Sequence, residues 1–313
     1  MLVDISVIIP TMNRPESLKQ TLESIAKCKI CPSEIIIVDQ SQNTEIAKIN
    51  REVLNLISNR TNVKYLYQDT PSLTCARNFG IRNAVNDIIV CSDDDVDVLA
   101  NTFNKIAEVM SDKTIAMIAG LDTNTVLAEG NRGGYFFGTK SYRKRKIGHV
   151  TKSMLGRFPI SVNDITDTEW AMGFFFVIRR NLQLKWNIWW DEQLTSYAYA
   201  EDLDFSYSYY KEAKNSGLRC IFHPEIIVTH NATQEYRVPS RKSALMYIIH
   251  RHYLAYKHGN VINQIAVRWT NMWKIVAAVR QPKYMRNLID AQVFVEKNRV
   301  LLKSGIIPEK VFE

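Results

Sequence analysis

Continuous apolar runs alternate along the chain with segments whose apolar residues recur every three or four positions. The apolar runs 5–9 and 34–39 flank residues 16–28, which have helical spacing. Continuous apolar runs are typical of strands buried on both faces, and spacing near 3.6 residues is typical of helices. The pattern therefore predicts strand, helix, strand, which is the opening of a doubly wound sheet.

The same alternation continues to about residue 231. It predicts an α/β fold with a mostly parallel sheet flanked by helices, followed by a helical region. Further helices are predicted over 45–58, 102–110 and 201–215, and further strands over 63–67, 88–91, 115–120, 170–180, 219–223 and 224–230. Gly173 falls inside one predicted strand, where a glycine allows close approach of another group such as a substrate.

Three adjacent acidic residues, Asp93, Asp94 and Asp95, follow the short apolar run 88–91. Open α/β sheets bind their ligands at the carboxyl ends of the strands. Three neighbouring carboxylates repel one another unless a cation neutralises them. Mg²⁺ and Mn²⁺ prefer oxygen ligands and keep positions open for phosphates. The triplet therefore indicates a divalent-metal site, and a solvated acidic turn is the alternative.

Other charged residues lie near predicted element ends. Arg77 precedes the acidic strand, where a cation suits a diphosphate or a base edge; an ordinary surface arginine is the alternative. Glu201 and Asp202 begin a predicted helix, whose dipole favours carboxylates there for structural reasons alone. His230 ends an apolar run, and its position by itself does not make it a metal ligand.

Composition limits the class of protein. With 313 residues and 46% hydrophobic content, the chain is long enough for one large domain and an appendage. No apolar run reaches the roughly 20 residues that cross a bilayer, and no basic segment precedes the first strand as in a signal peptide. Five cysteines without a framework spacing fit a reducing compartment. We therefore expect a cytoplasmic chain.

The net charge of +8 is concentrated in the tail. Residues 237–313 hold 14 Lys or Arg against 4 Asp or Glu, whereas residues 1–236 hold 26 against 28. We therefore predict a main α/β domain over 1–236 and a basic, aromatic helical extension over 237–313. Basic helices with Trp and Tyr on another face are typical of membrane interfaces. Packing on the main domain, or on a second subunit in a homodimer, is the alternative.

A second basic region covers residues 130–163, with eight basic residues and no acid. Either basic region suits an anionic lipid, a pyrophosphate-bearing acceptor or nucleic acid. The basic residues of this region are Arg132, Lys140, Arg143, Lys144, Arg145, Lys146, Lys152 and Arg157.

Taken in order, these motifs resemble the family 2 glycosyltransferases of the GT-A fold, over about residues 3–231. The motifs that carry the resemblance are Ser6-Val-Ile-Ile-Pro-Thr-Met-Asn-Arg, Val38-Asp39, Ala76-Arg-Asn-Phe-Gly, the acidic triplet, Trp170-Ala-Met-Gly, Glu201-Asp202 and Pro224-Glu-Ile-Ile-Val-Thr-His. Each motif is weak alone, but the ordered set is specific.

The resemblance implies a role for each matching residue. It assigns the nucleotide-sugar donor to Thr11, Asn13, Arg14, Asp39, Arg77, Asp93 and Asp94. It assigns Mg²⁺ or Mn²⁺ to Asp95, together with Asp93 and His230. It makes Asp202 the general base and Glu201 the group that orients it, with Asp191 and Asp204 as the nearest alternatives for the base.

The resemblance also implies the reaction: an inverting, metal-dependent transfer of a hexosyl group. The donor would be a UDP- or dTDP-linked sugar, and the acceptor a hydroxyl of a glycan or lipid-linked oligosaccharide in cell-surface polysaccharide assembly. The enzyme would then lie at the inner face of the cell membrane as a peripheral protein.

Two departures from the family pattern matter. The second strand ends Asp39-Gln-Ser, where many members have a second acid and a glycine, so uracil, thymine and guanine remain open as the base. The segment Gln264-Ile-Ala-Val-Arg-Trp269 is one residue longer than the Gln-x-x-Arg-Trp motif of polymer-making members. A non-processive enzyme is therefore expected.

Two other classes of function are weaker. A metal-dependent nucleotidyltransferase would carry a glycine-rich phosphate loop after the first strand, but residues 11–18 contain no glycine. A nucleic-acid-binding protein would explain the pI of about 9.1 but not acids at successive strand ends. We therefore expect no nucleic-acid partner.

Overall fold

The computed structural model describes residues 2–125, 127, 136–137, 145–194, 200–231 and 240–308. The strands are β1 (Leu2–Thr11), β2 (Cys31–Asp39), β3 (Asn62–Tyr67), β4 (Ile88–Ser92), β5 (Val96–Val98), β6 (Ile115–Asp122), β7 (His149–Val150), β8 (Gly156–Arg157), β9 (Thr166–Asp167), β10 (Phe175–Arg179) and β11 (Arg219–His230). The helices are α1 (Pro15–Ala26), α2 (Thr44–Val53), α3 (Leu73–Asn83), α4 (Thr102–Met110), α6 (Arg180–Lys185), α7 (Glu201–Asn215), α8 (Ser240–His258), α9 (Val261–Ala277), α10 (Pro282–Lys297) and α11 (Arg299–Lys303).

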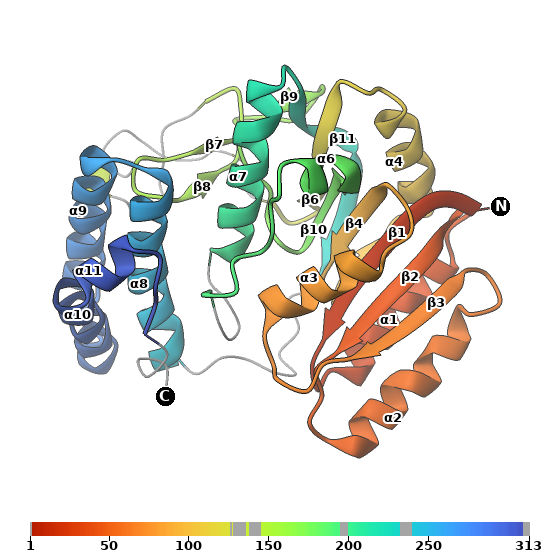
Figure 1. The fold of residues 1–313 in the computed structure, drawn as a ribbon, viewed down its shortest axis with the longest axis horizontal. Helices are drawn as coiled ribbons and strands as arrows, with labels where there is room; N and C mark the ends of the chain where they lie inside the picture. The colour runs from red at the N-terminus through yellow and green to blue at the C-terminus, as the bar shows by residue number, and fades with distance from the viewer. Residues whose placement is uncertain are drawn as a thin grey trace.

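The main sheet has the strand order β3-β2-β1-β4-β10-β6-β11-β5, and β9 also pairs with β11. Strands β3, β2, β1 and β4 are parallel, and β10 lies antiparallel between β4 and β6. Figure 1 shows the sheet on the right, helices α8–α11 on the left and α7 between them. The predicted α/β fold with a C-terminal helical region is confirmed.

Most predicted elements are found within a few residues of their expected bounds, but the strand over 170–180 is shorter than predicted. β10 begins only at Phe175. Before it, the backbone N–H groups of Ala171 and Gly173 donate to Ser206 Oγ and Asp202 Oδ2 of α7, at 3.0 and 2.9 Å. Because these N–H groups bond to side chains, the segment before β10 is outside the strand ladder.

Strand β1 organises the core, because it is buried on both faces. Val7 and Ile9 pack in one hydrophobic cluster with residues of α1, and Ile8 packs in another with residues of α3. On the α3 side, Gly80 lies so close to Ile8 that an added Cβ would overlap Ile8 Cγ2. This close contact fixes α3, and with it Arg77, against the central strand.

The C-terminal helices are built into the protein through α8. Its apolar residues Leu245, Ile248 and Ile249 share a hydrophobic cluster with Met154 and Trp170, which lie between β7 and β10. The predicted membrane-facing surface is therefore wrong for α8, whose apolar face is covered by protein. The predicted domain boundary between residues 236 and 237 lies outside the described residues.

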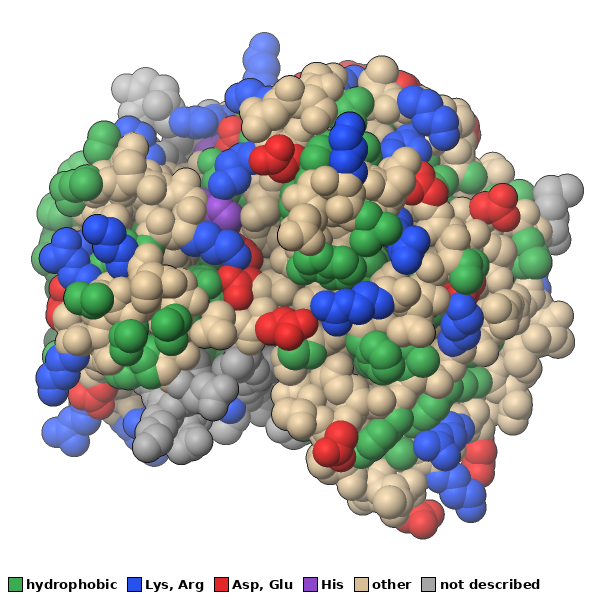
Figure 2. Space-filling view, viewed as in Figure 1, with side chains coloured by type: hydrophobic (Ala, Val, Ile, Leu, Met, Phe, Trp, Pro, Cys, Tyr) green, Lys and Arg blue, Asp and Glu red, His purple; other side chains and the backbone are tan. Residues whose placement is uncertain are grey.

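Helix α9, in contrast, has an exposed apolar stripe. The stripe consists of Ile262, Ile265, Trp269, Met272 and Val276, of which only Trp269 is half-buried and the others are exposed. Steps of three and four residues place these side chains on one helical face. Figure 2 shows hydrophobic side chains beside Lys and Arg on the left of the molecule, where Figure 1 labels α9. Among the helices of the described ranges, none combines the length and apolar character needed to cross a membrane.

We expect Gly80→Ala to destabilise the fold, because the new Cβ must push α3 away from Ile8 on β1. Such overpacking costs about 1–3 kcal/mol, measurable as the free energy of urea unfolding. Ile8→Ala removes Cγ2, so the double variant should lose clearly less than the sum of the two single losses. Losses that add within about 0.5 kcal/mol would contradict this contact.

Candidate active site

The acidic triplet follows β4, and its three side chains lie in different surroundings. The Asp93 N–H donates to Phe174 O at 2.8 Å, which continues the pairing of β4 with the β10 segment. The Asp93 side chain is 26% exposed, whereas those of Asp94 and Asp95 are 3% and 5% exposed. A solvated acidic turn is therefore excluded, because two of the three carboxylates are enclosed by protein.

Asp93, Asp95 and His230 form a group that fits a divalent metal. One ligand atom from each lies within 4.8 Å of the other two. His230 reaches the group because β11 pairs with β5, the strand directly after the triplet. The Phe174 ring stacks on its imidazole at a centroid distance of 5.1 Å. Two carboxylates and an imidazole are a suitable donor set for Mn²⁺ or Mg²⁺.

The protonation of this group favours one permanently charged ligand. Burial raises the pKa of Asp95, but the hydrogen bond from His230 and the charge of Arg14 outweigh it and lower that pKa to about 2. Burial lowers the pKa of His230, but its hydrogen bond with Asp95 reverses the shift and raises it. Burial raises the pKa of Asp93, although Arg77 opposes the shift. Of the two carboxyl groups in this metal group, that of Asp95 thus ionises more readily.

Asp94 is held by two side chains, one at the end of β1 and one just after it. Its Oδ2 accepts a hydrogen bond from Thr11 Oγ1 at 2.6 Å, and its Oδ1 lies 2.8 Å from Arg14 Nη1. The other guanidinium nitrogen, Arg14 Nη2, donates to Asp95 Oδ2 at 2.5 Å. Burial raises the pKa of Asp94 to about 7, although Arg14 opposes the shift. Thr11, Arg14 and Asp94 therefore lie together beside the metal group.

Asp39 lies next to Thr11 in the parallel register of β1 and β2. Its carboxylate is fully buried, and it accepts hydrogen bonds from the Ser41 N–H, Asn50 and Tyr65 at 2.7–2.9 Å. The Asn13 N–H donates to Ser41 Oγ at 2.9 Å, so the two strand-end turns are joined. Thr11, Asn13 and Asp39 are thus grouped at the carboxyl edge of the sheet.

Arg77 is buried, so its interpretation as a surface arginine is wrong. Its Nη1 donates to Glu201 Oε1 at 3.0 Å, and its Nη2 donates to Asp93 Oδ1 at 2.9 Å and to Gly173 O at 3.1 Å. The guanidinium lies over the Trp190 ring at 4.3 Å. Arg77 therefore links the metal group to the beginning of α7.

Glu201 and Asp202 begin α7 and share a buried environment. Asp202 accepts the N–H groups of Gly173 and Leu203 at 2.9 and 2.7 Å. Burial and the neighbouring Asp202 raise the pKa of Glu201 to about 8, whereas Arg77 lowers it. Burial also raises the pKa of Asp202, but the two backbone N–H groups oppose the shift. The two buried carboxyl groups thus hold their protons more tightly than free carboxyl groups do.

Gly173 lines the same space as these groups. A Cβ there would lie 3.1 Å from Asp202 Cβ and 3.2 Å from Arg77 Nη2. The glycine therefore allows close approach of these two side chains, and close approach of a substrate stays a prediction.

A cavity of about 390 Å³ joins these groups. Asp93, His230, Arg77, Glu201 and Asp202 all line it. Its volume is within the range of small-molecule sites. Thr11, Asn13 and Asp39 do not line it, and they lie at the neighbouring strand ends. Of the basic region, Arg157 lines the cavity. The predicted basic residues Arg132, Lys140, Arg143 and Lys144 lie outside the described residues.

The two other acids considered as the base, Asp191 and Asp204, are occupied elsewhere. Each pairs with Lys257 of α8, at 2.6 and 2.8 Å, and neither lines the cavity.

Sequence reasoning missed the aromatic supports of the site. Phe174 stacks on His230, and Trp190 packs under Arg77. Both residues belong to aromatic runs that the sequence marks as apolar. The runs do not indicate which polar group each ring would contact, because the partners are distant in sequence.

Solved structures of similar fold include S. aureus TarS, the mannosyltransferase PcManGT and GalNAc-T7. The S. aureus TarS structure matches with a TM-score of 0.53 and 16% identity over 88% of this chain and 44% of that chain. The mannosyltransferase PcManGT from Pyrobaculum calidifontis, in complex with GDP-Man and Mn²⁺, matches with a TM-score of 0.54 and 14% identity over 93% of this chain and 86% of that chain. GalNAc-T7 with UDP, GalNAc and Mn²⁺ matches with a TM-score of 0.56 and 19% identity over 87% of this chain and 54% of that chain.

These likenesses concern the fold, and the chain spans less than two thirds of the TarS and GalNAc-T7 chains. No curated protein matches the sequence closely. The family model described as glycosyl transferase family 2 matches residues 6–183, which is more than half of the chain. Together with a GT-A-like sheet and acids at its carboxyl edge, this match shows that the chain belongs to glycosyl transferase family 2, whose members take sugars from nucleotide-sugar donors.

Proposed function

We propose that the protein is an inverting, metal-dependent and non-processive hexosyltransferase. It would use a UDP- or dTDP-linked sugar and a hydroxyl of a glycan or lipid-linked acceptor in cell-surface polysaccharide assembly. One observation carries the proposal. Asp93 and His230 of the metal group line the same cavity as the Glu201–Asp202 pair, so a leaving group and an attacking group have separate partners in the same space.

The donor nucleotide would lie at the carboxyl edge of β1, β2 and β4. We assign it to Thr11, Asn13, Arg14, Asp39, Arg77, Asp93 and Asp94. Asp39 and Asp94 are enclosed, so they would act by holding the turns that contact the base and ribose. The structural neighbours in complex with UDP or GDP-Man support a nucleotide-sugar donor.

Asp95, Asp93 and His230 would hold Mn²⁺ or Mg²⁺, and their donor atoms fit such an ion. When bound, the ion supplies Lewis-acid neutralisation of the negative charge on the departing diphosphate.

The attacking group would be an acceptor hydroxyl in the cavity. Its oxygen forms a bond to the anomeric carbon as the bond from that carbon to the diphosphate oxygen breaks, and one displacement inverts the configuration. Asp202 takes the hydroxyl proton, because burial raises the pKa of its carboxylate and so makes it a stronger base, while the N–H groups of Gly173 and Leu203 hold it in place. Glu201 holds Arg77 and keeps the pair in position.

A peripheral position at the inner face of the membrane is part of the proposal. The apolar stripe of α9 supports it, since Arg268 and Lys274 lie on the same helix and Arg280 follows its end.

Arg268 is paired with Glu296 of α10, and no residue of α9 lines the catalytic cavity. The segment 264–269 therefore has no place in that cavity, which agrees with a non-processive enzyme.

The general base is tested by Asp202→Asn, which keeps the shape of the side chain and removes the proton acceptor. We expect kcat to fall by about 10²-fold or more while the affinity for the donor nucleotide stays nearly unchanged. Asp164→Asn, on an exposed loop, is the control and should leave both values unchanged. Retained activity, or loss of nucleotide binding instead of kcat, would show that the base is another residue.

The metal group is tested by Asp95→Asn and His230→Ala. Each should weaken Mn²⁺-dependent nucleotide binding by about tenfold or more in calorimetric titrations, because Asp95→Asn removes the negative charge of one ligand and His230→Ala removes the imidazole donor. His223→Ala removes a different imidazole from β11 and should preserve the metal dependence. If both ligand variants bound nucleotide with unaltered Mn²⁺ dependence, the assignment would be wrong.

Membrane contact is tested by co-sedimentation with liposomes at low salt. We expect the full chain to bind vesicles containing anionic lipid, and the double variant Met272→Glu, Val276→Glu to bind much less, since it puts charge into the apolar stripe. Val85→Glu changes an exposed apolar residue outside α9 and should bind like the parent. Equal binding of all three proteins, or none, would favour the stripe as a contact between subunits.

A further inference from the structure

A second cavity, of about 380 Å³, lies between α9 and residues 151–157; we call it the α9 groove. Helix α9 supplies apolar lining from Ile262, Ile265, Ala266 and Trp269. The opposite wall contains Lys152 and Arg157. Within the described part of the chain, no acidic residue lines the groove. It therefore combines an apolar floor with a cationic rim.

The walls of the α9 groove are fixed in place before any ligand arrives. The buried Arg251 of α8 donates to Ser153 O on one wall and to Thr270 Oγ1 and Asn271 Oδ1 of α9, at 2.7–2.8 Å. Asn263 of α9 also donates to Lys152 O at 3.1 Å. These bonds hold the two walls at a set separation, so the groove is not a chance gap between mobile surfaces.

The α9 groove is adjacent to the catalytic cavity. Arg157 lines both, and residues 151–157 supply lining to the groove at their start and to the cavity at their end. In the other direction, Ile262 and Ile265 continue into the exposed apolar stripe of α9. A single elongated molecule would therefore pass from the catalytic cavity, past a cationic rim, onto an apolar surface.

This order of surfaces matches an amphiphile with an anionic group between its two ends. An apolar chain gains by leaving water for the floor of the groove, whereas a water-soluble glycan would lose hydrogen bonds there. A phosphate or diphosphate would be attracted to Lys152 and Arg157. We propose that the α9 groove binds the apolar tail and phosphate of the acceptor, so that the acceptor is a lipid phosphate or diphosphate whose hydroxyl-bearing end enters the catalytic cavity.

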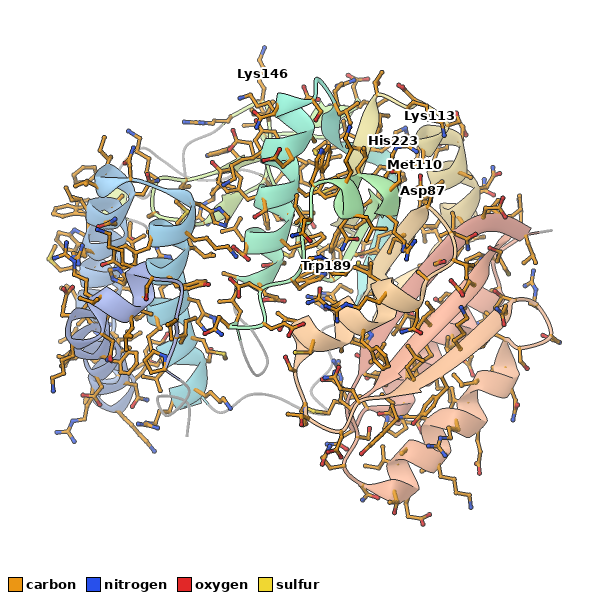
Figure 3. All side chains as sticks on the ribbon, viewed as in Figure 1. Asp87, Met110, Lys113, Lys146, Trp189 and His223 are labelled. Atoms are coloured by element: carbon orange, nitrogen blue, oxygen red, sulfur yellow. The ribbon has the colours of Figure 1, made fainter. Side chains whose placement is uncertain are left out.

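This inference rests on the proposed function, because it assigns the acceptor of that reaction. The probe for the test is dodecyl phosphate below its micellar concentration, titrated into the full chain by calorimetry. Inorganic phosphate alone and dodecyl maltoside serve as the head-only and tail-only arms. The substituted proteins are Ile265→Glu on the floor and Lys152→Glu on the rim. Their controls are Val300→Glu on α11 and Lys113→Glu, which lies near the amino end of β6, far from the groove (Figure 3).

We expect dodecyl phosphate to bind with one site per chain, and about tenfold or more weaker in Ile265→Glu and in Lys152→Glu, with both controls unchanged. Both inorganic phosphate and dodecyl maltoside should bind far more weakly than dodecyl phosphate. Equal binding of dodecyl phosphate to all proteins, no binding to the parent, or equal binding of dodecyl maltoside would overturn the inference.

Nucleotide binding with Mn²⁺, measured in the same proteins, separates this inference from the proposed function. Nucleotide binding should be unchanged in Ile265→Glu, because the groove is not part of the donor site. Failure of the parent to bind any nucleotide would refute the proposed function, whereas nucleotide binding without a dodecyl phosphate site would refute only the acceptor assignment. Binding of a second copy of the chain at the groove would appear as a dimer that Ile265→Glu dissociates, and it too would overturn the inference.

Discussion

The site depends on one buried cation, Arg77. Its guanidinium contacts Asp93 after β4, the Gly173 carbonyl before β10 and Glu201 at the start of α7, so three separate segments meet at one side chain. Leaving a buried carboxylate without its partner costs about 3–5 kcal/mol, which makes this arrangement strongly preferred once the surrounding core has formed. Because Arg77 is held in turn by Trp190 and by the packing of α3 on β1, the core of the sheet determines the distance between the metal group and the proposed base.

Two other buried arginines, Arg14 and Arg251, also join acceptors from separate segments of the chain. Arg14 holds Asp94 and Asp95 together, so that these crowded carboxylates are tolerated although they are buried. Arg251 joins α8, α9 and the segment after β7. A planar guanidinium has five donors in fixed directions, so it can join several acceptors from distant segments with little loss of side-chain freedom. The protein thus uses arginine where a catalytic fold must bring together groups that repel one another or that would otherwise stay apart.

The C-terminal helices are part of the catalytic framework because α8 is fastened to α7. Asp204, two residues after Asp202, is fully buried and pairs with Lys257 and His258 at the end of α8. Lys257 also pairs with Asp191, which precedes α7 in the chain. The start of α7 is therefore fixed both by the sheet, through Arg77, and by the extension. Because of this double attachment, α8 and the helices that follow it have a defined position relative to the cavity. A membrane or ligand that contacts α9 would therefore also have a defined position relative to the cavity.

The sequence by itself determined the order of strands and helices, and the edge of the sheet where Asp39, Asp93 and His230 collect. These features follow from local apolar spacing and from the polarity of parallel strands. Tertiary structure alone decided that Asp94 is enclosed while Asp93 faces the cavity, that Gly173 lies outside a strand, and that α8 buries its apolar face while α9 exposes a stripe. A local pattern reports that a residue is suited to burial. It does not identify the partner, because the partner comes from a segment whose position is set only when the whole core packs.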